Sequence, residues 1–418
     1  MFARLAAKMP MAGCHCVNVG HGIVDNKDMP MNERAKELVE TLKAQDDLHD
    51  PVVEEAFLRV PRHVFLPDCT PEEAYANIAV PLKRDAYGTV VSSASQPAMI
   101  AQMLEQLDLQ RGHNVLEIGT ASGYNAALMQ YIVGDEGRVT TMELDTDLAA
   151  MAELSLQRAL MSRIVVVHGD GAQGYAPRAS YDRIIATVGV WDIPPAWIRQ
   201  LRPNGKLVAP IWLDAFQVSA AFRHDPSGRG LYSEHNLPCW FVRLRGRDAG
   251  PGLTVRVIGS SLELVSSAAE QIDDAAVHAL LSDDAAINHL DMPLTFDQTL
   301  SGLLPYLALN TNPDVILTSY YVPDGSKSYG LHGAGFGLLM RGSACFLPFS
   351  ERGACHCFGS ADAFIVLQDT LAAWRAASTP LLDKLRVRVL PIEGSIPEIS
   401  AGRILTRRHH HIHMWMET

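Results

Sequence analysis

A glycine-interrupted segment, LEIGTASGYNAAL, has the residues and spacing of a cofactor-binding turn between a strand and a helix. A dinucleotide fingerprint, G-x-G-x-x-G, starting at Gly119 would need glycine where Ala121 and Tyr124 stand, because a pyrophosphate has to approach bare backbone. The other pattern is an acidic residue, one spacer and G-x-G-x-G, and the chain departs from it at one position. Its residues are Glu117, Gly119, Ala121 and Gly123. One methyl group at Ala121 is tolerated if the cofactor has no phosphate, so the turn favours a nucleoside cofactor without pyrophosphate.

The second pattern resembles the first motif of the S-adenosylmethionine-dependent methyltransferases, and two later segments agree with it. Glu143 ends the next expected strand about twenty residues after Gly123, where its carboxylate can accept both ribose hydroxyls. The resemblance implies that Asp170, in HGDG, contacts the adenine amino group. A tight strand-to-helix connection that holds no ligand is the alternative for the turn alone. The residues expected to bind S-adenosylmethionine are Gln96, Glu117, Gly119, Thr120, Ala121, Ser122, Gly123, Tyr124, Glu143, Leu144, Gly169, Asp170, Gly171, Thr187 and Val188.

The segments around this turn alternate between strand and helix patterns. We expect strands at 114–118, 138–143, 164–167, 181–187 and 206–210, and helices at 124–132, 148–160 and 195–200. Strands separated by helices indicate a parallel, doubly wound α/β sheet whose ligand crevice lies at the carboxyl ends of the strands. The expected fold is therefore a Rossmann-like class I methyltransferase sheet.

Helical elements are expected before the first of these strands. Apolar residues recur at helical spacing after Asn32 and again after Pro51, with Asp50 as the cap of the second helix. A third helix has Ser95 as its expected cap and Pro97 in its first turn.

Five segments stand in the order and approximate spacing of the protein-L-isoaspartate O-methyltransferases. They are RVPRHVFLP (59–67), SQPAMIAQMLEQL (95–107), VLEIGTASGYNAALM (115–129), HGDG (168–171) and YDRIIATVGVWDIPPAW (181–197). The resemblance covers about residues 32–225. It implies that the methyl group of S-adenosylmethionine is transferred to the α-carboxylate of an isoaspartyl residue, and that attack by a backbone nitrogen then collapses the ester to a succinimide.

This chemistry asks little of side chains, because a carboxylate is ionised and nucleophilic at neutral pH and needs no general base. The resemblance places a positioning hydroxyl at Ser95, and we expect the free N–H groups of the following helix to bind the same carboxylate. Ser92 and Ser93, expected in the same loop, are weaker catalytic candidates. A plain helix cap is the alternative role of Ser95.

A linker-like stretch, RGRDAGPG, separates two expected domains. Residues 1–31 are expected to be a disordered leader or a start-site artefact, residues 32–245 a methyltransferase domain, and residues 251–418 a C-terminal α+β domain. Within this last part we expect helices at 273–281 and 363–376, a loop-rich middle, a strand at LRVRVLP and an exposed terminal strand at RILTRRHHHIHMW.

The long C-terminal part resembles the layout of longer relatives that are encoded beside precursors of ribosomally made, modified peptides such as lanthipeptides, graspetides and lasso peptides. That resemblance implies methylation of an ordinary aspartate in a constrained peptide, giving aspartimide or isoaspartate, with the C-terminal domain recognising the peptide. Two alternatives stay open. One is a repair enzyme with an added dimerisation or stability domain, and the other is a non-catalytic module that holds a peptide for another enzyme.

The resemblance implies a peptide or protein partner that carries Asp or isoAsp, and composition argues against two other classes of partner. The 418 residues are 48% hydrophobic and 20% charged, with a net charge of -12 and no basic block, which argues against a nucleic acid. No apolar run approaches the roughly 18 residues of a membrane span. Seven cysteines without disulfide-like spacing, and no secretion signal, indicate a reducing cytoplasm. Cys14-His15-Cys16 and Cys355-His356-Cys357 are spaced more tightly than zinc ligands, so no metal is expected. Nothing in the composition favours one oligomeric state.

Overall fold

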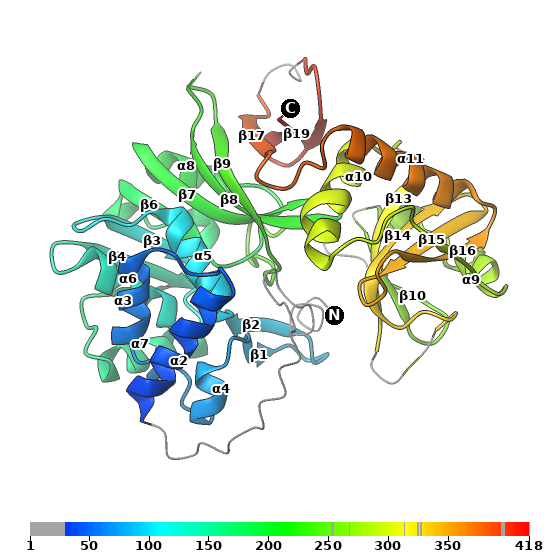
Figure 1. The fold of residues 1–418 in the computed structure, drawn as a ribbon. Helices are drawn as coiled ribbons and strands as arrows, with labels where there is room; N and C mark the ends of the chain where they lie inside the picture. The colour runs from blue at the N-terminus through cyan, green and yellow to red at the C-terminus, as the bar shows by residue number, and fades with distance from the viewer. Residues whose placement is uncertain are drawn as a thin grey trace.

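The computed structural model of the chain describes residues 30–417, except 227, 252–254, 267, 313, 324–325, 327 and 394–397. The expected leader falls almost entirely outside the described residues. Two sheets dominate the described chain, and Figure 1 shows each with its own helices in a separate lobe. We call the lobe with the ten-stranded sheet the first lobe, and the lobe with the seven-stranded sheet the second lobe.

The sheet of the first lobe has the order β18-β19-β17-β9-β8-β7-β6-β3-β4-β5. Its strands are β3 (Asn114–Ile118), β4 (Arg138–Glu143), β5 (Val165–His168), β6 (Tyr181–Ala186), β7 (Leu201–Leu213), β8 (Phe216–His224), β9 (Leu231–Pro238), β17 (Leu385–Pro391), β18 (Arg403–Thr406) and β19 (His410–Met416). The strands from β5 to β7 in this order are parallel, and the remaining pairs are antiparallel. The parallel half confirms the expected doubly wound sheet, and the antiparallel half extends it further than the sequence indicated.

The helices of the first lobe cover the parallel half. They are α2 (Met31–Ala44), α3 (Pro51–Arg59), η1 (Arg62–Phe65), α4 (Pro71–Tyr75), α5 (Pro97–Leu107), α6 (Tyr124–Val133), α7 (Thr146–Arg158), η2 (Gly171–Gln173), η3 (Ala176–Arg178) and α8 (Pro195–Gln200). Asp50 caps α3 as expected, because its side chain accepts a hydrogen bond from the Val52 amide at 2.7 Å. Phe57 of α3 and Tyr124 of α6 meet edge to face in the core, with ring centroids 6.2 Å apart.

A hairpin that the sequence analysis did not predict precedes α5. It consists of β1 (Val80–Arg84) and β2 (Val90–Ala94), which pair antiparallel. Ser92 and Ser93 lie on β2, so the expectation of a loop at these serines was wrong. Because neighbouring residues of a strand face opposite sides, Ser92 is buried and Ser93 half-buried. Figure 1 shows the hairpin projecting from the first lobe toward the space between the lobes.

The second lobe contains an antiparallel sheet with the order β10-β11-β13-β14-β15-β16-β12. Its strands are β10 (Val255–Ile258), β11 (Leu262–Val265), β12 (Ala286–His289), β13 (Ile316–Val322), β14 (Gly333–Met340), β15 (Ser343–Pro348) and β16 (Ala354–Gly359). Its helices are η4 (Ala269–Gln271), α9 (Asp274–Leu281), the π-helix η5 (Gln298–Leu303), α10 (Leu304–Asn310) and α11 (Asp362–Ala376). The two expected helices correspond to α9 and α11.

The expected loop-rich middle is instead the centre of this sheet, where β13 pairs with β14. Glycines in β14 prompted the wrong expectation. A Cβ atom on Gly335 would lie 2.4 Å from a ring carbon of Tyr320, and one on Gly337 would lie 2.6 Å from a ring carbon of Phe346. Glycine is therefore needed here because two aromatic rings cross the strand.

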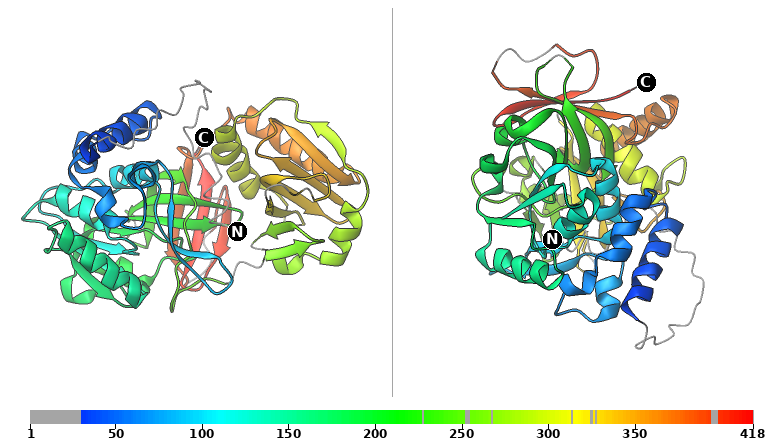
Figure 2. Two further views of the ribbon diagram at one scale, coloured as in Figure 1. Left: turned by 90° about the horizontal axis from the view of Figure 1, so that it is seen from below. Right: turned by 90° about the vertical axis from the view of Figure 1, so that its left-hand side faces the viewer.

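The chain returns to the first lobe after α11. β17 pairs with β9, with Val389 opposite Leu231, and Figure 2 shows the last strands lying beside those of the first lobe. Residues 251–418 were expected to form one C-terminal domain, but their last strands, within 385–416, belong to the sheet of the first lobe. Alternate residues of β17 are buried, so this strand needs the core of the first lobe.

The terminal strand β19 lies between β17 and β18, so it is not at the edge of the sheet. His410 and His411 are 4% and 5% exposed, and the expectation of an exposed strand was wrong. The segment that was expected to form one strand forms two, β18 and β19, which pair antiparallel.

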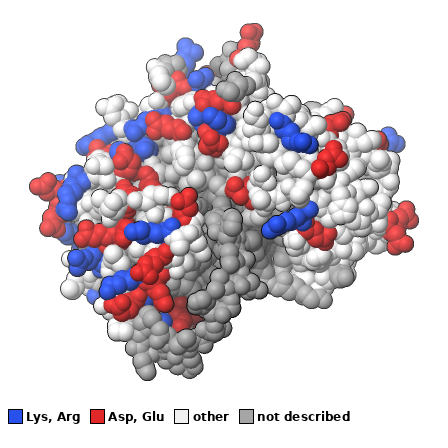
Figure 3. Space-filling view, viewed as in Figure 1, with Lys and Arg blue, Asp and Glu red and all other residues white. Residues whose placement is uncertain are grey.

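Charged side chains are intermixed on the face of the first lobe in Figure 3, and the second lobe carries fewer of them on this face. Within the described ranges, the structure contains no helix that is long and apolar enough to cross a membrane.

Candidate active site

The turn after β3 is shaped by Gly119. Its φ of +99° is one that side chains with a Cβ rarely adopt, and a Cβ here would lie 2.7 Å from the Thr187 hydroxyl. That hydroxyl donates to the Gly119 carbonyl oxygen at 2.7 Å. The close approach of the β3 turn to the end of β6 therefore requires glycine at this position.

Ala121, the departure from the glycine pattern, also lies in the left-handed region, with a φ of +49°. A residue with a Cβ pays about 1–2 kcal/mol for this conformation. The Ala121 amide donates to Glu143 Oε2 at 2.9 Å, which holds the turn against the end of β4. The strained turn is thus kept in place by an acidic side chain that was expected to bind ribose.

Glu143 is largely occupied by backbone donors. Its Oε1 accepts from the amides of Leu144 and Asp145 at 2.9 and 3.1 Å, in addition to the Ala121 bond on Oε2. A carboxylate offers about four lone-pair positions, so one remains on Oε2. In this arrangement Glu143 can accept a hydrogen bond from one ribose hydroxyl. It could accept from both ribose hydroxyls, as expected, only if one of the three amides gave up its bond to the carboxylate.

Glu117 faces inward and is completely buried. Its carboxylate accepts from the Thr141 hydroxyl at 2.6 Å and from the Asn125 amide at 2.7 Å. Burial raises the pKa of Glu117 to about 7, because an apolar environment disfavours the charged form. This acid therefore borders the crevice as a buried, readily protonated group.

Two adjoining pockets open at this edge of the sheet, with volumes of about 440 and 530 Å³. Both are bordered by Ser93, Gly119, Ala121 and Thr187. Most of the residues expected at the site line one or both: Ser92, Ser93, Ser95, Glu117, Gly119, Thr120, Ala121, Ser122, Tyr124, Glu143, Leu144, Gly171, Thr187 and Val188. The donor set fits S-adenosylmethionine, since bare backbone, a carboxylate and hydroxyls border the two pockets.

Four expected residues are not part of the pocket walls. Gln96 and Gly123 are the N-terminal cap positions of α5 and α6. The Gly169 amide donates to the backbone at the end of β4, and its side of the turn does not reach the pockets. The Asp170 carboxylate accepts from the Arg247 amide at 2.7 Å, so a later segment of the chain now meets the group that was expected to contact adenine.

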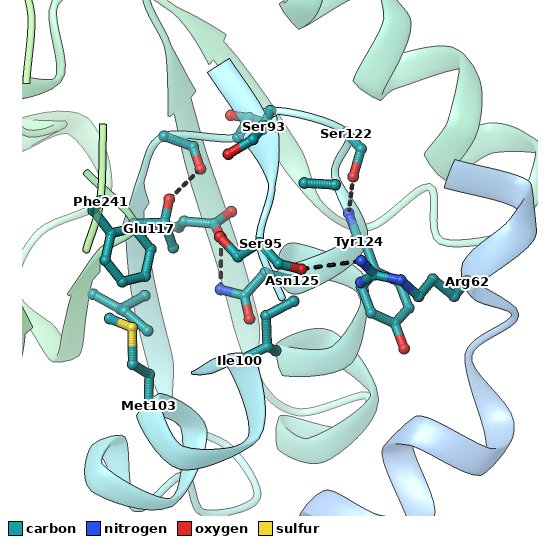
Figure 4. A pocket seen from close by; sticks show the side chains of 16 residues that line it. Arg62, Ser93, Ser95, Ile100, Met103, Glu117, Ser122, Tyr124, Asn125 and Phe241 are labelled. Atoms are coloured by element: carbon teal, nitrogen blue, oxygen red, sulfur yellow. Dashed lines mark hydrogen bonds between the residues drawn. The ribbon is translucent and has the colours of Figure 1, made fainter. Parts of the chain in front are cut away.

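Ser95 lines the smaller pocket but does not cap α5. The cap position is Gln96, and no side chain makes the capping hydrogen bond, so the alternative role of Ser95 as a plain helix cap was wrong. The first turn of α5 also offers fewer free amides than expected, because Pro97 has none and the Ala98 amide donates to Asn77 Oδ1 at 3.0 Å. Figure 4 shows Ser95 between the Glu117–Asn125 pair and Arg62.

Arg62 was missed as a site residue, although RVPRHVFLP contains it. Its side chain is completely buried, and its Nε and Nη2 donate to the carbonyl oxygens of Ala74 and Ser95 at 2.8 and 3.0 Å. The guanidinium carbon lies 4.8 Å from the centre of the Tyr124 ring. Burial lowers its pKa, and no carboxylate of the described residues forms an ion pair with it. A buried cation without an anion at the pocket wall favours a negatively charged ligand.

A second missed feature is the segment that follows β9. Phe241 lines the smaller pocket, and residues 242–245 line the larger one. The Gly189 amide donates to the Val242 carbonyl oxygen at 2.7 Å, and the Leu244 amide to the Gly189 carbonyl oxygen at 2.9 Å. Its sequence, FVRLR, carries no periodicity or glycine pattern that could have revealed this position.

No three His, Cys, Asp or Glu side chains of the described residues are grouped as a metal site. Cys14-His15-Cys16 lies outside those residues. Cys355 and Cys357 are buried on β16, and the Cys357 sulfur is 3.6 Å from that of Cys345. These thiols belong to the core between the lobes.

Comparison with known proteins places these features in a family. The model of the family described as protein-L-isoaspartate(D-aspartate) O-methyltransferase matches residues 33–249. The chain is 42% identical over 187 residues to the protein-L-isoaspartate O-methyltransferase of Methanopyrus kandleri, and 41% identical over 201 residues to that of Pyrococcus horikoshii. These alignments cover 44% and 47% of this chain, and 80% and 87% of the two relatives. A solved structure described as a protein-L-isoaspartate O-methyltransferase aligns with 90% of this chain and 98% of its own, with a TM-score of 0.49 and 22% identity. The chain therefore belongs to the protein-L-isoaspartate O-methyltransferase family and is an S-adenosylmethionine-dependent O-methyltransferase of that type.

Proposed function

We propose that the protein methylates the carboxylate of an aspartyl or isoaspartyl residue in a ribosomally made peptide, as a tailoring step. The observation that supports an acidic acceptor is one pocket that brings Ser93, Ser95 and the buried Arg62 guanidinium to the Gly119 turn. Repair of isoaspartyl proteins uses the same acceptor chemistry and is the second candidate. The second lobe favours tailoring, for the reason given below.

The two pockets are assigned to different ligands, the larger to the cofactor and the smaller to the acceptor. Gly119, Ala121, Glu143 and Val188 border the larger pocket, which we assign to the nucleoside. S-adenosylmethionine supplies an activated methyl group when bound. Gly119 borders both this pocket and the smaller one, so the turn would hold the cofactor next to the acceptor side.

The acceptor carboxylate is ionised at neutral pH and attacks without a general base. Ser95 and Ser93 offer hydroxyl donors, and Arg62 adds positive charge near them. These groups would bind and orient the acceptor carboxylate, and such positioning is the main source of rate in a displacement of this kind. Phe241 and Ile100 add apolar surface that excludes water.

The second lobe adjoins this pocket through an aromatic cluster. Trp240 packs against the buried Tyr321 of the second lobe, as do Phe296 and Phe349. Trp240 directly precedes Phe241 of the pocket wall. This adjacency supports a role for the second lobe in recognising the peptide around the acceptor, which a small repair enzyme would not need.

The test uses three peptides with the same flanking sequence: a linear isoaspartyl peptide, a linear aspartyl peptide and a macrocyclic aspartyl peptide. Mass spectrometry follows methyl gain and later water loss. Tailoring requires methylation of the macrocyclic aspartyl peptide, with Ser95→Ala lowering the rate at least tenfold. Methylation of the linear isoaspartyl peptide alone would establish repair instead. If calorimetry detects no binding of S-adenosylmethionine to the folded protein, the chain is a non-catalytic peptide-binding module.

A further inference from the structure

One wall of the cofactor crevice is a segment that connects the lobes. We call residues 241–248 the strap. Its Arg243 forms a parallel bridge with Gly189, next to the end of β6, and its residues 242–245 border the larger pocket. A ligand in that pocket therefore lies against the strap.

The strap is held on its cofactor side by acidic residues of the first lobe. Arg245 forms an ion pair with Asp145, just after β4. The Arg247 amide donates to Asp170 Oδ2 at 2.7 Å. Gly246, with a φ of +94°, has no side chain that would collide with that carboxylate, since a Cβ there would lie 2.7 Å from Asp170. The strap thus reaches both acids that follow the cofactor-side strands β4 and β5.

The opposite side of the strap is held by the far end of the chain. Arg408 Nη1 donates to the Arg247 carbonyl oxygen at 2.9 Å and lies 3.4 Å from Asp248 Oδ1. The His409 ring nitrogen Nε2 is 3.2 Å from the same Asp248 oxygen. These contacts join positions that lie 161 residues apart in the sequence.

The residues that make these contacts are themselves fixed to the first lobe. We call residues 407–410, the turn that enters β19, the latch. Asp192, which is 3% exposed, accepts from the His409 amide at 2.6 Å and pairs with His410 Nδ1 at 2.7 Å. Arg407 lies over the Trp191 ring, 4.7 Å from its centre. The latch is therefore a rigid support, whereas the strap contacts that it makes are partly exposed.

We propose that the latch holds the strap over the cofactor pocket, so that the C-terminal end of the chain sets the affinity for S-adenosylmethionine. The proposal rests on the assignment of the larger pocket to the nucleoside. The cofactor cannot leave past the strap without breaking the bonds of Arg247 and Asp248 to the latch. Arg408 and Asp248 are positioning residues in this scheme, because they act through the strap and do not line the pockets.

The experiment measures binding of S-adenosylhomocysteine by calorimetry to the full chain. Arg408→Ala and Asp248→Ala should each raise its Kd about tenfold, the change that loss of about one net hydrogen bond to a charged group produces. The double variant should raise the Kd by clearly less than the product of the two single effects, because the two substitutions share the Arg408–Asp248 contact. With cofactor at saturation, kcat and the KM for the acceptor peptide should stay within about twofold of wild type.

The matched control is Arg386→Ala. Arg386 forms an ion pair with Glu417 at 2.7 Å. This pair lies at the end of the β17–β19 ladder opposite to the latch. Its Kd for S-adenosylhomocysteine should equal that of wild type. Unchanged Kd values in folded Arg408→Ala and Asp248→Ala overturn the latch but leave the proposed function intact. An equal rise in Arg386→Ala overturns it too, because the effect would then be general destabilisation. Failure of wild type to bind the probe overturns both.

Discussion

Arg62 Nη2 donates to the backbone carbonyl oxygen of Ser95 at 3.0 Å, which ties the segment after α3 to the segment that enters α5. The same guanidinium donates to the Ala74 carbonyl oxygen at 2.8 Å. A single buried cation therefore fixes the position of the serine that is proposed to hold the acceptor. Its role combines geometry and charge, and these can be separated by substitution.

Arg62→Met should lower the free energy of unfolding by about 2–4 kcal/mol, because two buried carbonyl groups lose a charged donor. Arg62→Lys keeps the charge but not both bonds, so it should recover part of the acceptor kcat/KM at equal stability loss. Chemical denaturation and steady-state kinetics check this. Arg59→Ala, at an exposed position of α3, is the control and should change neither value. Equal kcat/KM in the Met and Lys variants would contradict a role for the charge.

Ala121→Gly should keep or raise stability, by up to about 1 kcal/mol, because the left-handed conformation suits glycine. Ala121→Val should destabilise the protein, since a β-branched residue fits that conformation poorly. Thermal unfolding of both variants tests the prediction. Ala126→Gly, at a buried position in the first turn of α6, is the matched control and should lower stability. If both glycine variants are destabilised alike, the backbone at Ala121 is not strained.

The parallel half of the first sheet could be predicted because its signals are local. Each strand and helix shows its own periodicity, and the Gly119 turn follows a short fixed pattern. The family comparison confirms the expected fold and cofactor. Ser95 was expected to cap α5 from its type alone, but the position next to Pro97 is taken by Gln96.

The remaining features depend on contacts between distant segments, which single-sequence patterns do not reveal. The strap reaches Asp170 and the latch across 77 and 161 residues. β17 resembles any amphipathic strand, and its sequence does not say that it pairs with β9 in another lobe. Gly335 and Gly337 indicated a loop because glycine is rare in strands, whereas the tertiary packing of two rings requires them.

Stability should fall as pH rises from about 4.5 to about 7, in part because of Glu117. Its pKa is raised from 4.5 to about 7 in the folded protein, so the unfolded state releases its proton first. The favourable contribution of protonated Glu117 to the free energy of unfolding is therefore complete below pH 4.5, and it is lost as the pH rises toward 7. The shift corresponds to at most about 3 kcal/mol.

Glu117→Gln should remove this dependence and make the protein more stable than wild type at pH 8. The glutamine can accept from Thr141 and donate to the Asn125 side chain after rotation of that amide. Unfolding is measured for both proteins at pH 5 and pH 8. Asp47, whose pKa burial raises to about 6, titrates equally in both and cancels in the difference. A difference that is the same at the two pH values would contradict the raised pKa.

Ser233→Ala should show that the C-terminal strands stabilise the first lobe. The buried Ser233 hydroxyl accepts from the Val387 amide of β17 at 2.8 Å, and its loss leaves that amide without a partner. The expected decrease in the free energy of unfolding is about 1–3 kcal/mol. Ser162→Ala, the same substitution at an exposed position, should have no effect. Hydrogen exchange locates the change: in the Ser233 variant, exchange should accelerate in β9 and β17 together, because the two strands share the lost bond. Faster exchange in β17 with unchanged exchange in β9 would contradict the prediction. It would mean that β9 is stable without β17 and that the C-terminal strands do not stabilise the first lobe.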